Sequence, residues 1–128
     1  MRGYVLDASA LLALLNEEPG SEQVADFIAV GAVMSTVNFA EVVTKLREAD
    51  VTEEIIHEAL DPLGIIMLNF DTALAYEVGL LRPLTKQTGL SLGDRACLAL
   101  AKHLQLPAIT SDPVWGNLSL NIKIQVIQ

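Results

Sequence analysis

The sequence predicts an α/β fold in which helices cover both faces of a five-stranded parallel sheet. Short apolar runs of strand length alternate along the chain with longer stretches whose apolar residues recur at helical spacing. Polar residues that can cap a helix stand before most of the longer stretches, and proline or glycine follows several of them. Because buried strands that alternate with helices need crossover connections, the strands are expected to be parallel.

The chain is expected to open with a strand and two helices. A short buried run covers residues 4–6, and residues 8–15 are apolar almost all round, as in a buried helix. Pro19 and Gly20 would end that helix. Ser21 would then cap a second helix that runs to about residue 29.

The middle of the chain repeats this alternation. Residues 32–37 predict a second strand, after which Asn38 can cap a helix to about residue 49. Thr52 can cap the next helix, which runs to residue 60, and residues 65–68 predict the third strand.

The last part of the chain predicts two more helices and two more strands. Asp71 would begin a helix to about residue 84, and Ser91 would begin another that ends near residue 104. Residues 108–110 and 122–127 are the expected fourth and fifth strands.

Length and composition limit the kind of protein. A chain of 128 residues has the usual size of one domain, and 52% hydrophobic residues are enough for a packed core. The net charge of −8 argues against a broad basic surface for nucleic acid, but it does not exclude a nuclease whose acids surround a cation. The single cysteine and the lack of a long apolar run favour a soluble cytoplasmic protein with no membrane partner. We therefore expect one domain over residues 1–128.

Four acidic residues are expected at the same end of the sheet. Asp7 ends the first strand, Glu41 lies in the helix after the second, Asp94 opens the helix before the fourth, and Asp112 follows the fourth. In parallel α/β sheets, sites form beyond the carboxyl ends of the strands, where the strand order reverses. The predicted fold therefore brings all four carboxylates within reach of one site.

Each of the four acids also has a purely structural interpretation. Asp7 could be a helix N-cap, as Asp71 is expected to be in a similar strand-to-helix segment. Glu41 could pair with Lys45 one helical turn later, and Asp112 could form a turn before proline.

Asp94 carries the sharpest signal, because its helical neighbours Leu90, Cys97, Leu98 and Ala101 form an apolar stripe. A carboxylate in such a stripe is costly unless it is paired or binds a metal, although the helix dipole also favours an acid in the first turn.

The convergence of the four acids favours a cation site. Clustered carboxylates repel one another unless a cation lies between them, and an all-oxygen set selects Mg²⁺ or Mn²⁺.

Other candidate sites are not supported by the sequence. Glycine-rich phosphate-binding loops are absent, and His57 and His103 lack the spacing of metal ligands. Cys97 and Trp115 are interpreted as core residues.

Four segments resemble the motifs of PIN-domain ribonucleases. Residues 5–15 are similar to the first motif, 38–42 to the second, 90–101 with its Gly-Asp-Arg core to the third, and 110–112 with Trp115 to the last. The resemblance spans nearly the whole chain. The size of the chain resembles that of the VapC-type toxins of toxin–antitoxin pairs. It implies a three-layer α/β sandwich and an endoribonuclease dependent on Mg²⁺ or Mn²⁺. It also implies a homodimer and a cognate antitoxin whose C-terminal segment occupies the active-site groove.

The resemblance also implies roles for individual residues. Asp7, Asp94 and Asp112 would be metal ligands, and with Glu41 they would form the catalytic set. The small polar residues of the motifs, Ser9 and Thr110, would support that set.

Three basic residues near the acids, Arg95, Lys45 and Arg47, are candidates for holding the RNA backbone or else are solvated surface charges.

Two other functions remain open on the sequence alone. One is a binding protein on the same fold, in which the acids are caps and surface charges. The other is a hydrolase of a small phosphorylated metabolite. DNA is a lesser alternative to RNA as the substrate, because nothing in the sequence selects for the 2′-hydroxyl.

Overall fold

The computed structural model, which describes residues 3–128, confirms the predicted α/β class. Five parallel strands form one sheet in the order β3–β2–β1–β4–β5. The strands are β1 (Tyr4–Leu6), β2 (Ala32–Ser35), β3 (Ile66–Leu68), β4 (Ala108–Thr110) and β5 (Ile124–Val126).

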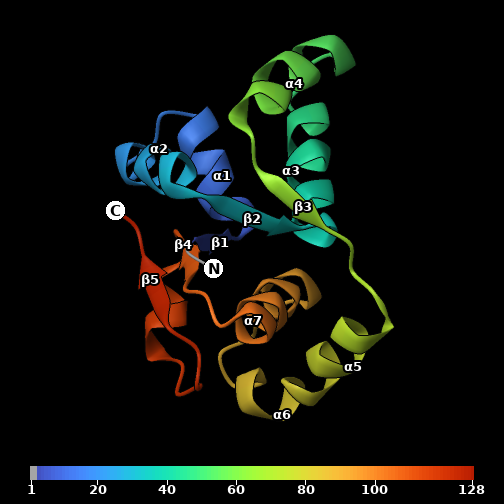
Figure 1. Ribbon diagram of the computed structural model, residues 1–128, viewed down its shortest axis with the longest axis vertical. Helices are drawn as coiled ribbons and strands as arrows, with labels where there is room; N and C mark the ends of the chain where they lie inside the picture. Colours follow the sequence, from blue (N-terminus) through green and yellow to red (C-terminus); the bar gives the residue numbers. More distant parts are fainter. Residues whose placement is uncertain (1–2) are drawn as a thin grey trace.

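Helices lie on both faces of the sheet, so the fold has three layers (Figure 1). Figure 1 shows α1 and α2 on one side of the strands and α5, α6 and α7 on the other. The buried residues of α3 and α4 belong to the same core as those of α1 and α2. The helices are α1 (Ala8–Leu15), α2 (Ser21–Val30), α3 (Thr36–Glu48), α4 (Glu53–Leu60), α5 (Thr72–Leu80), α6 (Arg82–Thr85) and α7 (Leu92–Leu104). Two short 3₁₀ helices, η1 (Asp61–Leu63) and η2 (Pro113–Asn117), follow α4 and β4.

The sheet divides the apolar interior into two cores. Successive side chains of a strand point to opposite faces, so Val5 packs with α5 and α7 whereas Leu6 packs with α1 and α2. Trp115 and Cys97 are fully buried in the α7 core, as predicted. The described residues include no helix long and apolar enough to cross a membrane.

The second strand ends earlier than predicted. The Ser35 hydroxyl accepts a hydrogen bond from the Val37 backbone N–H at 3.2 Å and caps α3, which begins at Thr36. The prediction that Asn38 caps this helix is therefore wrong, because Asn38 lies inside α3 and is buried. Ser35 at the strand end therefore provides the cap three residues before the expected one.

The predicted helix from Asp71 to residue 84 is divided into α5 and α6. Pro83 has no backbone N–H and cannot bond to the carbonyl one turn earlier, so α5 ends at Leu80 and a short helix begins at Arg82.

The N-cap of α2 also differs from the prediction. Gly20 rather than Ser21 occupies this position, and its φ of 95° is in the left-handed region that glycine tolerates.

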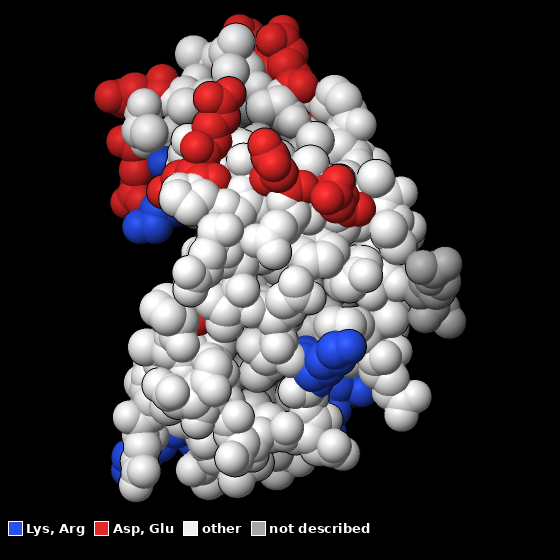
Figure 2. Space-filling model, turned by 90° about the vertical axis from the view of Figure 1, so that its left-hand side faces the viewer, with Lys and Arg blue, Asp and Glu red and all other residues white. Residues whose placement is uncertain are grey.

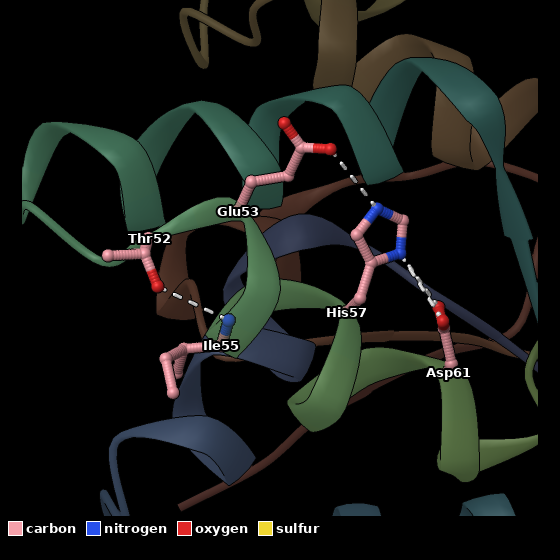
Figure 3. Close-up of polar contacts among 5 residues, drawn as sticks. All are labelled: Thr52, Glu53, Ile55, His57 and Asp61. Carbon is pink, nitrogen blue, oxygen red and sulfur yellow. Dashed lines mark hydrogen bonds and ion pairs between the residues drawn. The ribbon is translucent and has the colours of Figure 1, made fainter.

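Helix α4 begins as predicted, with Thr52 as its N-cap (Figure 3). His57 lies on the exposed side of this helix between Glu53 and Asp61, and its Nδ1 is 3.3 Å from the Asp61 carboxylate. These exposed contacts contribute little to stability.

A cavity of about 690 Å³ lies between α3 and α4, and none of the four predicted site acids lines it.

The order of the strands defines where a site is expected. The chain moves from β1 through β2 to β3 on one side, and then returns past β1 to β4 and β5 on the other. The strand order therefore reverses between β1 and β4, and Asp7 and Asp112 follow the carboxyl ends of these two strands.

Candidate functional site

The structure brings the four predicted acids together around one cavity of about 210 Å³. The cavity lies beyond the carboxyl ends of β1, β2 and β4, where the fold predicts a site. The residues that line it are Asp7, Ala8, Ser9, Leu12, Asn38, Glu41, Lys45, Asp94 and Asp112.

Asp7 is both a helix cap and a member of the cavity. Its Oδ1 accepts a hydrogen bond from the Ala10 backbone N–H at 2.8 Å and thereby caps α1. Its carboxylate also accepts hydrogen bonds from the hydroxyls of Ser9 and Thr110. The cap is therefore compatible with a site role, and capping places the carboxylate at the positive end of the helix dipole.

Burial raises the pKa of Asp7 from 3.8 to about 6, because only 4% of the residue is exposed. Hydrogen bonds from Thr110, Ala10 and Ser9 lower this pKa, whereas the nearby charge of Asp94 raises it. The effect of desolvation on this pKa therefore exceeds that of the hydrogen bonds, and the folded protein disfavours the anionic form of Asp7.

Ser9 and Thr110 connect the ends of β1 and β4. The Ser9 hydroxyl accepts a hydrogen bond from the Ser111 backbone N–H at 2.9 Å and lies 3.2 Å from the Thr110 hydroxyl. The Thr110 hydroxyl in turn accepts a hydrogen bond from the Asp112 backbone N–H at 3.1 Å. These two hydroxyls thus hold the loop that carries Asp112 against Asp7.

Asp112 is a helix cap as well, and Asp94 belongs to a capping box. Asp112 Oδ1 accepts from the Val114 backbone N–H at 3.0 Å and caps η2. Asp94 and Ser91 form a capping box at the start of α7, in which Asp94 Oδ2 accepts from the Ser91 N–H at 2.9 Å. Three helical segments therefore start at the cavity, and their N–H groups favour anions there.

Cys97 lies beneath the acids, one turn after Asp94 on α7. Burial raises the pKa of this thiol well above its ordinary value, and the charges of Asp7, Asp94 and Glu41 raise it further. The thiol is therefore protonated and unreactive at neutral pH.

Glu41 has a different partner from the one expected. Lys45 lies 3.8 Å from Glu48, whereas Glu41 Oε1 accepts a hydrogen bond from the Asn38 side-chain amide at 2.9 Å. Gly93 lies against the same carboxylate, since a Cβ on this glycine would be 2.5 Å from Glu41 Oε1.

Asn38 and Gly93 were not predicted as site residues. The sequence signals that could have found them are an asparagine one helical turn before Glu41 and a glycine in the first turn of a helix, where alanine is more stable.

The three basic candidates differ in whether their side chains line the cavity or bind elsewhere. Lys45 lines the cavity, and its side chain is exposed. Arg95 does not line it, because its Nη1 donates to the Val78 carbonyl of α5 at 3.0 Å. Arg47 donates to the Val51 carbonyl at 2.9 Å. The structure thus places Lys45 at the cavity and gives Arg95 a contact between α7 and α5.

A sequence model of the PIN domain matches residues 4–119, which is most of the chain. The chain belongs to the PIN domain family. No curated protein sequence matches this chain.

Solved structures with the same fold cover nearly all of this PIN domain, at identities that establish the fold alone. VapBC2 from Rickettsia felis, bound to a promoter DNA fragment, has a TM-score of 0.74 and 16% identity, with 98% of both chains covered. A toxin–antitoxin complex from Klebsiella pneumoniae has a TM-score of 0.71 and 20% identity, with 90% of this chain and 92% of that chain covered. A sarcin–ricin loop cleaving VapC toxin from Mycobacterium tuberculosis has a TM-score of 0.70 and 14% identity, with 91% and 97% covered.

The donor atoms of this PIN domain fit a hard cation. All four acids at the cavity offer carboxylate oxygens, which are the atoms that Mg²⁺ and Mn²⁺ prefer. Within the described residues, no three His, Cys, Asp or Glu side chains are already arranged as a metal site. Capping accounts for this, because Asp7, Asp94 and Asp112 each direct an oxygen toward a backbone N–H. Ligand binding would therefore use the remaining oxygens or require side-chain rotation.

Proposed function

We propose that this PIN domain is an endoribonuclease dependent on Mg²⁺ or Mn²⁺, and that it is the toxin of a toxin–antitoxin pair. The observation that carries the proposal is the meeting of four carboxylates, from four separate segments, at one cavity beyond the carboxyl ends of the strands. Such a set is unfavourable without a cation, because like charges repel and Asp7 is also buried.

The structural matches support RNA as the substrate and an antitoxin as the partner. One matched protein is described as a toxin that cleaves the sarcin–ricin loop, and two are toxin–antitoxin complexes. They match this chain along nearly its whole length and share its domain size.

In the proposed mechanism, Asp7, Asp94 and Asp112 would hold the cation, and Glu41 would orient the attacking water. A bound Mg²⁺ or Mn²⁺ would acidify that water and neutralise charge on the scissile phosphate. Lys45, the basic residue at the cavity, contacts the RNA backbone. The water oxygen bonds to phosphorus and gives up a proton to the solvent, the bond from phosphorus to the 3′-oxygen breaks, and that oxygen takes up a proton from the solvent. The products are a 5′-phosphate and a 3′-hydroxyl.

The distribution of charge supports an approach of RNA over the second half of the chain. Apart from the four site acids, residues 1–61 contain ten acids and three basic residues, whereas residues 62–128 contain two and five. Figure 2 shows most of the acids gathered over the upper part of the molecule, with some basic side chains beside them at the left edge and the other visible basic side chains in the lower part. Apart from the four site acids, the negative charge is therefore concentrated in the first half of the chain, and the surface formed by the second half is the less repulsive one for RNA.

Cleavage of RNA by variants of Asp94 and Asp71 tests the function. Structured RNA is incubated with the protein in Mn²⁺, in Mg²⁺ and in EDTA, and product ends are mapped. We expect metal-dependent cleavage that falls about 100-fold or more in Asp94→Asn, because this change removes one charge from the cation site.

Asp71→Asn is the matched control. Asp71 caps α5 through a 3.0 Å bond from the Leu74 N–H, as Asp7 caps α1, but it does not line the cavity. Activity should therefore stay within about twofold of the wild type, because asparagine is also a good cap. Equal activity of the wild type and Asp94→Asn would contradict the nuclease assignment.

The same assay separates the two other functions. Hydrolysis of a small phosphorylated metabolite, with intact RNA at the same metal concentration, would replace the proposal by a metabolite hydrolase. Absence of any metal-dependent hydrolysis would favour a binding protein.

A homodimer is part of the proposal, and α5 with α6 offers a surface for it. Tyr76 and Leu80 lie one turn apart on α5 and are 73% and 69% exposed, and Leu84 on α6 is 65% exposed. Large apolar side chains grouped on one surface indicate a contact with another molecule. We expect light scattering to give twice the chain mass for the wild type. Leu80→Lys should give the chain mass, and a wild-type monomer would contradict the dimer.

A further inference from the structure

Asn38 occupies an unusual position for a polar side chain. It lies within α3, one turn before Glu41, and only 1% of it is exposed. Its amide nitrogen donates two hydrogen bonds of 2.9 Å, one to Glu41 Oε1 and one to the Gly93 carbonyl oxygen. The side chain therefore connects the carboxylate of one helix with the first turn of another.

The orientation of the amide is determined by its partners. Both Glu41 Oε1 and the Gly93 carbonyl are acceptors, so the nitrogen must face them. Asn38 Oδ1 is then buried without a partner among the described residues, although Asn38 lines the cavity. A buried acceptor without a partner is unfavourable for folding, so stability alone does not account for asparagine at this position.

An amide can hold Glu41 without neutralising it. A lysine or arginine partner would cancel the negative charge and compete with a cation, whereas the amide donates a hydrogen bond and leaves the carboxylate anionic. Lys45 is available one turn later, but it lies beside Glu48 instead.

Gly93 restrains the same carboxylate from the α7 side. A Cβ at position 93 would lie 2.5 Å from Glu41 Oε1 and 2.6 Å from its Cδ and Oε2. Only glycine leaves room for the carboxylate here, next to Asp94 in the sequence. Glu41 is thus held by a donor on one side and accommodated by a missing side chain on the other.

We propose that Asn38 is a positioning residue for Glu41. Its amide fixes the carboxylate toward the cavity and ties α3 to the first turn of α7, which sets the placement of Glu41 relative to Asp94. This role rests on the proposed nuclease function, in which Glu41 orients the attacking water. Asn38 acts through Glu41 and has no contact with the reacting atoms of its own.

A double-mutant cycle between Asn38 and Glu41 tests this role. Initial rates of RNA cleavage are measured for Asn38→Ala in the wild-type and the Glu41→Gln backgrounds, with long incubations for the slow variants. In the wild type, kcat should fall about 10- to 100-fold, the range expected for a lost hydrogen bond to a charged group, with KM within about twofold. In Glu41→Gln the same substitution should change kcat by less than about twofold.

Two further substitutions separate positioning from folding. Asn38→Asp keeps the shape but places an anion where the amide donates, so it should lower kcat at least as much as Asn38→Ala. Asn121→Asp adds the same charge at an exposed position that lines another cavity, and its activity should match the wild type.

Crystal structures of the wild type and Asn38→Ala provide a readout that does not depend on activity. We expect the Glu41 carboxylate to leave Gly93 in the variant, while α7 keeps its place. An unmoved Glu41, or an equal loss of kcat in both backgrounds, would overturn the positioning role. A displaced Glu41 in a protein whose wild type cleaves no RNA would instead retract the nuclease function and keep the positioning of Glu41.

Discussion

Replacing Asp7 by asparagine is expected to stabilise the cation-free protein near neutral pH and to abolish RNA cleavage at the same time. The pKa of Asp7 is about 6 in the fold and 3.8 ordinarily, so folding disfavours the anion. Protonated Asp7 therefore stabilises the fold, and this contribution is complete below pH 3.8 and is lost as the pH rises through 6. The difference between the two pKa values corresponds to about 3 kcal/mol.

Asparagine removes the buried charge and can keep the cap. Its side-chain oxygen can accept from the Ala10 N–H, and its nitrogen can donate to the Thr110 hydroxyl. We expect the free energy of unfolding of Asp7→Asn at pH 7.5 in EDTA to exceed that of the wild type by about 1–3 kcal/mol. The loss of stability that the wild type shows between pH 4 and 7 should be smaller by the same amount.

Chemical denaturation between pH 4 and 8 measures this difference. Asp71→Asn, the matched cap variant, should leave the pH dependence unchanged, because Asp71 is exposed and caps α5 outside the cavity. Addition of Mn²⁺ should stabilise the wild type and not Asp7→Asn, because a ligand that binds only the folded state raises its stability. A variant that is no more stable than the wild type at pH 7.5 would show that the burial of Asp7 carries no such cost.

Gly93→Ala is expected to lower activity strongly with little loss of stability. The new Cβ would lie 2.5 Å from Glu41 Oε1, which is the end of a flexible side chain, so the carboxylate can rotate away. Rotation breaks the hydrogen bond from Asn38 and removes Glu41 from its place at the cavity. We expect kcat for RNA cleavage to fall about 10- to 100-fold, as for the loss of that bond.

The free energy of unfolding of Gly93→Ala should rise slightly or hardly change relative to the wild type. Alanine is favoured over glycine inside a helix by about 0.5–1 kcal/mol, which offsets the loss of the hydrogen bond. Denaturant titration should therefore place Gly93→Ala within about 1 kcal/mol of the wild type.

Gly79 provides the matched control. It lies in α5, and a Cβ there would meet nothing within 4 Å. Gly79→Ala should therefore gain about 0.5–1 kcal/mol and keep full activity, with its mass in solution checked because α5 carries the proposed dimer surface. If Gly93→Ala cleaves RNA at the wild-type rate, the contact between Gly93 and Glu41 has no part in catalysis.

The same carboxylates cap helical segments and line the cavity at this site. Asp7, Asp94 and Asp112 each accept a hydrogen bond from the backbone at the start of a helical segment, and each lines the cavity. At Asp7 and Asp112, which follow strands, the cap holds the carboxylate where the chain turns into a helical segment. Asp71 forms the same kind of cap away from the cavity, which explains why sequence spacing could not distinguish it from Asp7.

Hydrophobic periodicity determined the α/β class, the five strands and most helices, because these depend on spacing within one segment. The position of the acids relative to the strands also located the cavity in advance, since parallel strands bring their carboxyl ends to one edge.

Only the tertiary structure decided which residues act on those acids. The contact of Asn38 with Gly93 joins positions 55 residues apart, and the bond from Thr110 to Asp7 joins positions 103 apart. The raised pKa of Asp7 likewise follows from burial by several segments. The local sequence pattern therefore indicated which acids lie at the site. The packing of distant segments decided the hydrogen-bond partners and the burial of each acid, because contact and desolvation arise only when the chain is folded.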